Sequence, residues 1–197
     1  MDSTLYRQLI GSLMYLVNTR PDICFAVNTL SHFMVKPRRV HWVAAKHILC
    51  YVQGTVDYGL DYRRGDGVRL VGYTDSDWAR CASDRKNTLG CCFELGSAVL
   101  SWFSRKQNSV ALSSSEAEYI IASQASCEAI WIHKLLYGLF NQEFRPMVIH
   151  CDNQSCIKLT ENPVFHDKSK HIDIRYHFIR DYVQKGTMKL EYISTDE

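Results

Sequence analysis

The chain has 197 residues, of which 46% are hydrophobic and 22% are charged, and its formal net charge is +2. This length and hydrophobic content suffice for a packed core and exclude a wholly disordered chain, whereas the near-neutral charge neither favours nor excludes a polyanionic partner. Eight cysteines without a CxxC pair indicate reduced, buried thiols. Because we find no apolar leader and no stretch long enough to cross a bilayer, we expect a soluble cytoplasmic or nuclear protein that is not secreted and has no membrane partner.

The first quarter of the chain has helical periodicity. Apolar residues recur at helical spacing in three pieces, residues 5–17, 21–35 and 38–54. Pro21 suits the first turn of the second piece, and Gly54 closes the third. We therefore predict an all-helical arm.

The period then changes from helical spacing to two. Gly, Asp, Asn and Ser residues separate short runs of alternating apolar residues, which predict strands in an antiparallel meander. These runs are "GLDYRR" (59–64), "RLVGYTDSDW" (69–78), "TLGCCFELG" (88–96) and "AVLSWFSRK" (98–106).

The second half of the chain predicts alternating helices and strands. A serine run at 113–115 offers a helix N-cap, and the apolar spacing after it predicts a long helix to residue 140. The remaining expected elements are a strand in "MVIHCDNQS" (147–155), a brief helix to about residue 161, an amphipathic helix over 168–186 and a last strand in "TMKLEYIST" (187–195).

Acidic residues lie where three of these elements could converge. Asp75 is in a strand, Glu116 or Glu118 is in the first turn of the long helix, and Asp152 ends a later strand. Carboxylates held together repel one another unless cations lie between them, and hard oxygen ligands favour Mg²⁺ or Mn²⁺. Two such ions, roughly 3.5–4 Å apart, activate a water and stabilise a leaving oxygen in phosphodiester cleavage.

Several blocks of the sequence carry a family resemblance. "GYTDSDWA", "SWFSRKQNSVALSSSEAEYIIAS", "HCDNQSCIKLTENP" and "KHIDIRYHFIRDYV" closely resemble the ribonuclease H region of copia-type LTR retrotransposon polyproteins, over about residues 68–197. "YRQLIGSLMYLVNTRPDICFAVNTLSHFM" and "HWVAAKHILCYVQGT" resemble the segment just after the reverse transcriptase catalytic core. The resemblance implies a ribonuclease H-like mixed five-stranded sheet flanked by helices, over 61–197, preceded by the helical arm, 1–60.

The resemblance also implies a set of metal ligands. Asp75 in "YTDSD" matches the aspartate that bridges both magnesium ions, and Asp152 in "HCDNQS" matches the aspartate that ends the fourth strand. Glu118 fits the family's Ala-Glu-apolar pattern better than Glu116. Asp77 and Glu116 are better explained as a strand-end acid and an acid near a helix N-terminus.

A fourth acid of the family lies in a terminal helix beyond the last strand. This chain ends at "STDE", and neither Asp196 nor Glu197 is a convincing replacement. We therefore expect a domain that lacks its terminal helix and has a weakened second metal site. The Tyr-x-Asp-Asp signature of reverse transcriptases is absent, so we do not expect this chain to polymerise DNA alone.

Basic residues near aromatic residues are candidates for nucleic-acid binding, because cations hold phosphates while rings pack against sugars. A solvated helix face explains Lys168 and Lys170 about as well. Cys151 and Cys156 flank Asp152, but without a second thiol pair the sequence does not predict a zinc site. The candidates for nucleic-acid binding are Arg105, Lys106, Lys168, Lys170, His171 and Arg175.

The resemblance implies a Mg²⁺-dependent endonuclease, with Mn²⁺ as a possible substitute, that hydrolyses the RNA strand of RNA/DNA hybrids as part of a Pol polyprotein. Its partners would be the hybrid and the rest of that polyprotein, reverse transcriptase included. One alternative is a truncated, catalytically inactive relic that retains at most nucleic-acid binding. Another is recruitment as a host or secreted effector protein, for which the sequence has no targeting signal.

Overall fold

The computed structural model describes residues 2–63, 69–77, 86–107, 111, 113–141, 146–161 and 178–194. The chain divides into two compact units. The first contains residues 1–62 and 103–105, and the second contains residues 63–102 and 106–197. Among the described residues, no helix combines the length and the apolar character needed to cross a membrane.

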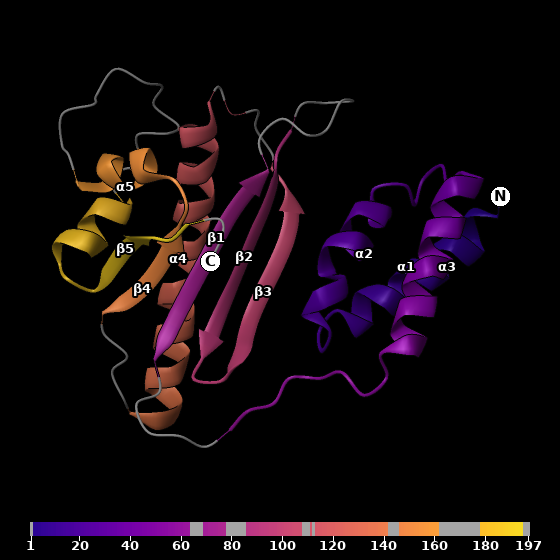
Figure 1. The fold of residues 1–197 in the computed structure, drawn as a ribbon, viewed down its shortest axis with the longest axis horizontal. Helices are drawn as coiled ribbons and strands as arrows, with labels where there is room; N and C mark the ends of the chain where they lie inside the picture. The colour runs from indigo at the N-terminus through magenta and orange to yellow at the C-terminus, as the bar shows by residue number, and fades with distance from the viewer. Residues whose placement is uncertain are drawn as a thin grey trace. The chain divides into compact units, whose positions relative to one another are not determined.

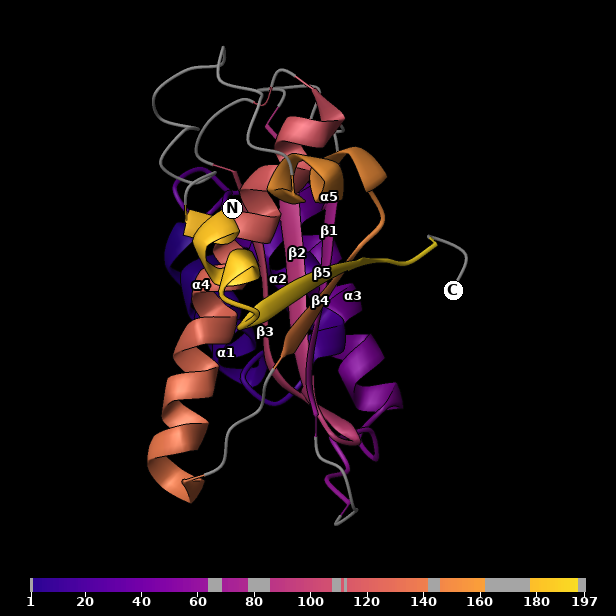
Figure 2. The ribbon, with the colours of Figure 1, turned by 90° about the vertical axis from the view of Figure 1, so that its left-hand side faces the viewer.

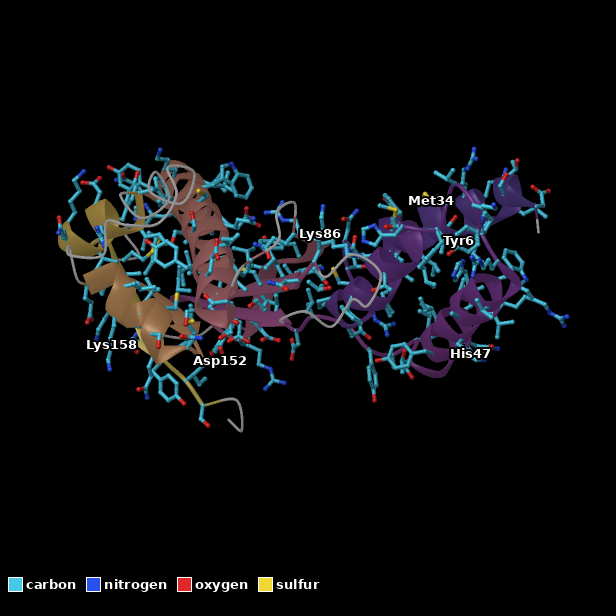
Figure 3. The ribbon with its side chains drawn as sticks, turned by 90° about the horizontal axis from the view of Figure 1, so that it is seen from above. Tyr6, Met34, His47, Lys86, Asp152 and Lys158 are labelled. Carbon is cyan, nitrogen blue, oxygen red and sulfur yellow. The ribbon has the colours of Figure 1, made fainter. Side chains whose placement is uncertain are left out.

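The first unit begins with an all-helical arm, as predicted. It contains α1 (Ser3–Leu16), a 3-10 turn η1 (Pro21–Ile23) that leads into α2 (Cys24–Ser31), and α3 (Arg39–Gly54). The helices enclose a small apolar core, in which Tyr6 is fully buried and donates its hydroxyl to the Leu30 carbonyl at 2.8 Å (Figure 3). The other buried members of this core are Ile10, Leu13, Ile23, Val27, Leu30, Ala45 and Ile48.

A buried arginine ties the helices of the arm together. Arg20 is 7% exposed, and its Nη2 donates to Asp22 Oδ2 and to Thr55 Oγ1, each at 2.7 Å. Tyr51, on α3, donates its hydroxyl to the same Asp22 oxygen at 2.8 Å. The hydrogen bond from Arg20, with help from that of Tyr51, lowers the pKa of Asp22. The start of η1 is therefore fixed to the end of α3.

The second unit contains the predicted mixed five-stranded sheet (Figure 1). Its strands are β1 (Leu70–Asp77), β2 (Thr88–Leu95), β3 (Ala98–Lys106), β4 (Met147–Cys151) and β5 (Met188–Tyr192). They lie in the order β3-β2-β1-β4-β5. β1 pairs antiparallel with β2 and parallel with β4, which in turn pairs parallel with β5. β1 is therefore the central strand.

Two expected elements differ from the structure. Residues 59–63 form no strand, so the predicted meander has three strands instead of four. Instead of joining a ladder, the Arg63 amide donates to the Ser97 hydroxyl in the β2–β3 turn at 2.9 Å. Of the amphipathic helix predicted over 168–186, residues 178–184 are helical, and the part before residue 178 lies outside the described residues.

A long helix covers one face of the sheet (Figure 2). α4 (Ser114–Phe140) begins at Ser113, whose hydroxyl accepts from the Glu116 amide, and ends at Asn141, which adopts φ 51°. Alternate residues of β2 and β4 are buried, as expected where one sheet face packs against a helix. A shorter helix, α5 (Gln154–Glu161), follows β4.

Gly72 lets β1 and β2 pack closely. A Cβ atom at this position would lie 2.5 Å from Cε1 of Phe93, whose ring is 1% exposed. Any larger residue would overpack this point, at a cost of about 1–3 kcal/mol. Gly72 therefore leaves the space that the ring of its cross-strand partner, Phe93, occupies.

Candidate active site

The carboxyl ends of two neighbouring strands bring two of the predicted acids to one edge of the sheet. Thr74 of β1 pairs with Cys151 of β4 in parallel register. Asp75 and Asp152 are the next residues along each strand direction, so both lie at this edge. Asp152 stands just before α5, the helix that carries Lys158 (Figure 3).

Glu118 reaches the same edge from the first turns of α4. It is 5% exposed, and one of its carboxylate oxygens, Oε1, accepts two hydrogen bonds from Ser76. The Ser76 amide donates at 3.1 Å and its hydroxyl at 2.6 Å. Since Ser76 follows Asp75 on β1, these bonds fix the helix to the strand that carries the first acid.

The structure gathers three possible ligand residues at this point. One ligand atom from each of Glu118, Cys151 and Asp152 lies within 4.8 Å of the other two. The Cys151 thiol donates weakly to Glu118 Oε2 at 3.8 Å. Asp75 is exposed and is not part of this close group, although it is near enough for its charge to act on Glu118.

The environment of Glu118 raises its pKa to about 7. Burial is the main cause, because it penalises the charged form, and the negative charges of Asp152 and Asp75 add to it. The hydrogen bonds from Ser76 act in the opposite direction. The carboxylate would therefore be stabilised by a cation placed among these acids.

The donors at this edge fit a magnesium site. Carboxylate oxygens are the ligands that Mg²⁺ and Mn²⁺ prefer, and a divalent ion would stabilise the charged form of Glu118, which burial and then the neighbouring acids disfavour. Asp75, Glu118 and Asp152 would hold it. Their assignment as metal ligands remains a prediction, as does the number of ions.

Sequence reasoning missed two residues of the site. Ser76 was not singled out, although its position directly after Asp75 places it on the opposite face of β1, toward α4. Cys151 was considered only with Cys156 as a thiol pair. Its position directly before Asp152 at a strand end was the available signal that it would join the acids.

Glu116 and Asp77, explained from the sequence as an acid near a helix N-terminus and a strand-end acid, lie at such positions. Glu116 is in the first turn of α4, where a negative charge is favoured by the helix dipole. Asp77 closes β1.

The predicted nucleic-acid residues are only partly described. Arg105 is exposed near the end of β3, with its guanidinium 4.3 Å from the centre of the Phe103 ring, and Lys106 is half-buried. These two stay candidates for nucleic-acid binding. The other four, Lys168, Lys170, His171 and Arg175, lie outside the described residues.

Comparison with known proteins identifies the family. No protein-family model matches the chain. The retrovirus-related Pol polyprotein from transposon RE2 of Arabidopsis thaliana is 44% identical over 196 residues, which is 100% of this chain and 14% of that protein. The chain belongs to the copia-type, retrovirus-related Pol polyproteins. It spans a small part of the length of these Pol relatives.

A match to a shorter protein covers most of that protein's length. The secreted RxLR effector protein 161 of Plasmopara viticola is 45% identical over 133 residues, which cover 67% of this Pol chain and 94% of the effector.

Two solved structures are similar in fold to the chain over nearly its whole length. The foamy viral protease-reverse transcriptase in complex with dsDNA matches with a TM-score of 0.64 at 15% identity, over 95% of this chain and 37% of that one. The same viral protein in complex with an RNA/DNA hybrid matches with a TM-score of 0.50 at 13% identity, over 94% of this chain and 24% of that one.

Proposed function

We propose that this Pol chain is a metal-dependent endonuclease that hydrolyses the RNA strand of RNA/DNA hybrids during reverse transcription. The observation that carries the proposal is the close approach of Glu118, from α4, to Asp152, at the end of β4, at the edge of a ribonuclease H-like sheet where the charge of Asp75 on β1 also acts on Glu118. Membership of the Pol family supports the reaction class. A foamy viral protein of similar fold binds an RNA/DNA hybrid, which supports the substrate.

Each acid has a defined part in this proposal. Ser76 holds Oε1 of Glu118, which leaves Oε2 directed to the cluster with Cys151 and Asp152. Asp75, exposed on the neighbouring strand, is open to both substrate and solvent. Two Mg²⁺ ions, or Mn²⁺, held by these carboxylates would activate a water and stabilise the leaving oxygen.

The substrate would be recognised by its backbone. Cations such as Arg105 and Lys106 would hold phosphates, and contact with the 2′-hydroxyl would distinguish RNA from DNA with little sequence preference. The products would be a 3′-hydroxyl and a 5′-phosphate. The rest of the Pol polyprotein, with its reverse transcriptase, would supply the hybrid.

The test is cleavage of a hybrid labelled on the RNA strand, with Mg²⁺, by the 197-residue chain and two variants. We expect the wild type to cut the RNA, and Asp75→Asn to lose at least about 100-fold in rate, because metal-held charge contributes several kcal/mol. Asp57→Asn, an exposed acid in the arm, is the matched control and should keep the wild-type rate.

The same assay separates the proposal from its rival. A chain that is folded and binds the hybrid without cutting it would overturn the enzyme proposal and support nucleic-acid binding without catalysis. Equal loss in Asp75→Asn and Asp57→Asn would show that the effect does not come from the acidic edge.

A further inference from the structure

One stretch of the helical arm carries positive charge without any acid. Residues 32–47 run from the end of α2 through the first half of α3 and contain no aspartate or glutamate. Their lysines and arginines are all exposed, and none forms an ion pair with any residue in the described part of the chain. These cations are Lys36, Arg38, Arg39 and Lys46. Together with Arg7 of α1, we call them the basic surface.

Contacts with both neighbouring helices hold the loop between α2 and α3. The ring of Phe33, which follows α2, stacks on the imidazole of His41 in the first turn of α3, with ring centroids 3.8 Å apart. His41 Nδ1 accepts a hydrogen bond from the Arg38 amide at 3.1 Å. Nε of Arg7 donates to the Met34 carbonyl at 3.2 Å, which brings an exposed cation of α1 to this loop. The cations of the loop therefore extend from a well-held backbone.

The basic surface continues along one exposed face of α3. Arg39 and Lys46 are seven residues apart, so they share a helix face and are separated by about 10.5 Å along its axis. Val43 between them is exposed, whereas Ala45 and Ile48 belong to the core of the arm. Successive phosphates of one strand rise by about 3.4 Å along a duplex axis, so this separation corresponds to about three nucleotide steps.

The position of two of these cations is unfavourable for the helix itself. The N-terminus of a helix is the positive end of its dipole, where acids are favoured and cations are not. α3 nevertheless begins with Arg38 and Arg39 and has no acid in its first turn. Residues that break a local rule of this kind are expected at functional sites. This is an observation separate from the exposure of the cations, and it also points to an anionic partner.

We propose that the basic surface binds the phosphate backbone of a nucleic-acid duplex. Cations distributed over two helices and a loop suit the regularly spaced phosphates of a duplex, and contact with the backbone alone carries no sequence preference. No residue of the acidic edge takes part. The choice of nucleic acid over another polyanion rests on the proposed function.

The test is the binding of a fluorescently labelled RNA/DNA hybrid to the 197-residue chain, measured by anisotropy in EDTA so that no metal-dependent cleavage occurs. At about 0.15 M salt, we expect Arg39→Gln and Lys46→Gln each to weaken binding about fivefold, because each lost phosphate contact releases about 0.9 fewer counterions. The slope of log K against log salt should fall by about 0.9 in each variant. Lys134→Gln, which removes an exposed cation on α4 without an ion pair in the described part of the chain, is the matched control and should bind as wild type.

Two outcomes would overturn the proposal. One is an unchanged affinity and salt slope in Arg39→Gln and Lys46→Gln, or an equal change in Lys134→Gln. The other is displacement of the hybrid by a poly-glutamate peptide as readily as by unlabelled hybrid, which would assign the surface to an acidic protein. Both substituted residues are exposed, so the variants should fold. Binding in EDTA requires no cleavage, so this proposal and the nuclease proposal can fail separately.

Discussion

In the helical arm, the carboxylate of Asp22 is about one-third exposed and yet has a guanidinium, a tyrosine hydroxyl and solvent to stabilise it. At the edge of the sheet, the carboxylate of Glu118 is 5% exposed and has one serine, one thiol and two other acids around it. The pKa of Asp22 is lowered and that of Glu118 is raised to about 7. Among the residues that the structure describes, the more deeply buried of the two acids, Glu118, has no cationic side chain paired with it.

The contrast separates two uses of a carboxylate. Arg20 and Asp22 form an ion pair within the chain, so each charge has a partner in the folded arm and removal of either one would destabilise it. At the sheet edge, burial and the charges of Asp75 and Asp152 disfavour the charged form of Glu118, so ionisation of this carboxyl costs stability. Removal of the cation beside Asp22 should therefore destabilise the arm, whereas neutralisation of Glu118 should stabilise the unit that contains the sheet.

The largest effect is expected from Glu118→Gln without divalent cations. Below about pH 4.5 the carboxyl keeps its proton in both folded and unfolded chains; between 4.5 and about 7 only the folded chain keeps it, so stability falls as the pH rises. At about pH 8 the variant should be more stable than wild type by about 3 kcal/mol, at about 1.4 kcal/mol per pKa unit. Hydrogen exchange of the α4 and β1 amides measures this difference.

The same experiment has an internal control. The gain should shrink to nearly nothing below pH 4.5, and Mg²⁺ should stabilise the wild type but not the variant. A gain that does not change with pH would mean that Glu118 has an ordinary pKa, and the contrast with Asp22 would disappear.

The next effect has the opposite sign and is expected in the arm. Arg20→Met leaves Asp22 without its cation and the carbonyl and hydroxyl of Thr55 without their donor. The arm should lose about 2–3 kcal/mol, which is below the cost for a fully buried pair because Asp22 is partly exposed. Hydrogen exchange of the α1 and α3 amides would show it. Lys46→Met, which removes a cation that only faces the Trp42 ring, should cost much less.

The smallest effects come from removing one hydroxyl beside each carboxylate. Tyr51→Phe should raise the pKa of Asp22 and destabilise the arm by about 1 kcal/mol, because it removes a hydrogen bond to a charged oxygen. Ser76→Ala should raise the pKa of Glu118 further, since the Ser76 hydrogen bonds lower it. Carboxyl NMR titrations measure both. If Ser76→Ala left the pKa of Glu118 unchanged, the serine would not help to stabilise its charge.

Most of the sheet could be predicted from the sequence because its strands carry alternating patterns, and in β2 and β4 every second residue is buried over most of the strand. The run from Ala98 to Lys106 is a strand of the predicted length, and Ser113 and Asn141 bound the long helix as cap residues do. The strand predicted over 59–64 is wrong for residues 59–63, which form no strand. An alternating pattern does not reveal whether a partner strand is available.

The candidate site was predictable only in part. Family blocks located Asp75, Glu118 and Asp152, but spacing along the chain gives no distances. The register that pairs Thr74 with Cys151, and the hydrogen bonds that place Ser76 under Glu118, depend on tertiary packing. Cys151 entered the site for the same reason, because Glu118, to which its thiol donates, lies 33 residues earlier on α4.

The parallel pairing of β1 with β4 has a consequence for how the chain is made. The hydroxyl of Thr74 donates to the carbonyl of His150, 76 residues later, so the central strand lacks one of its two neighbours until most of the chain has been synthesised. Strand pairs so far apart in sequence form slowly, because the entropy cost of closing a long loop comes before the pairing contacts stabilise the chain. The acidic edge is therefore assembled late in folding, and a nascent or cleaved polypeptide that stops before β4 lacks Asp152 and the strand that brings it to the edge next to Asp75.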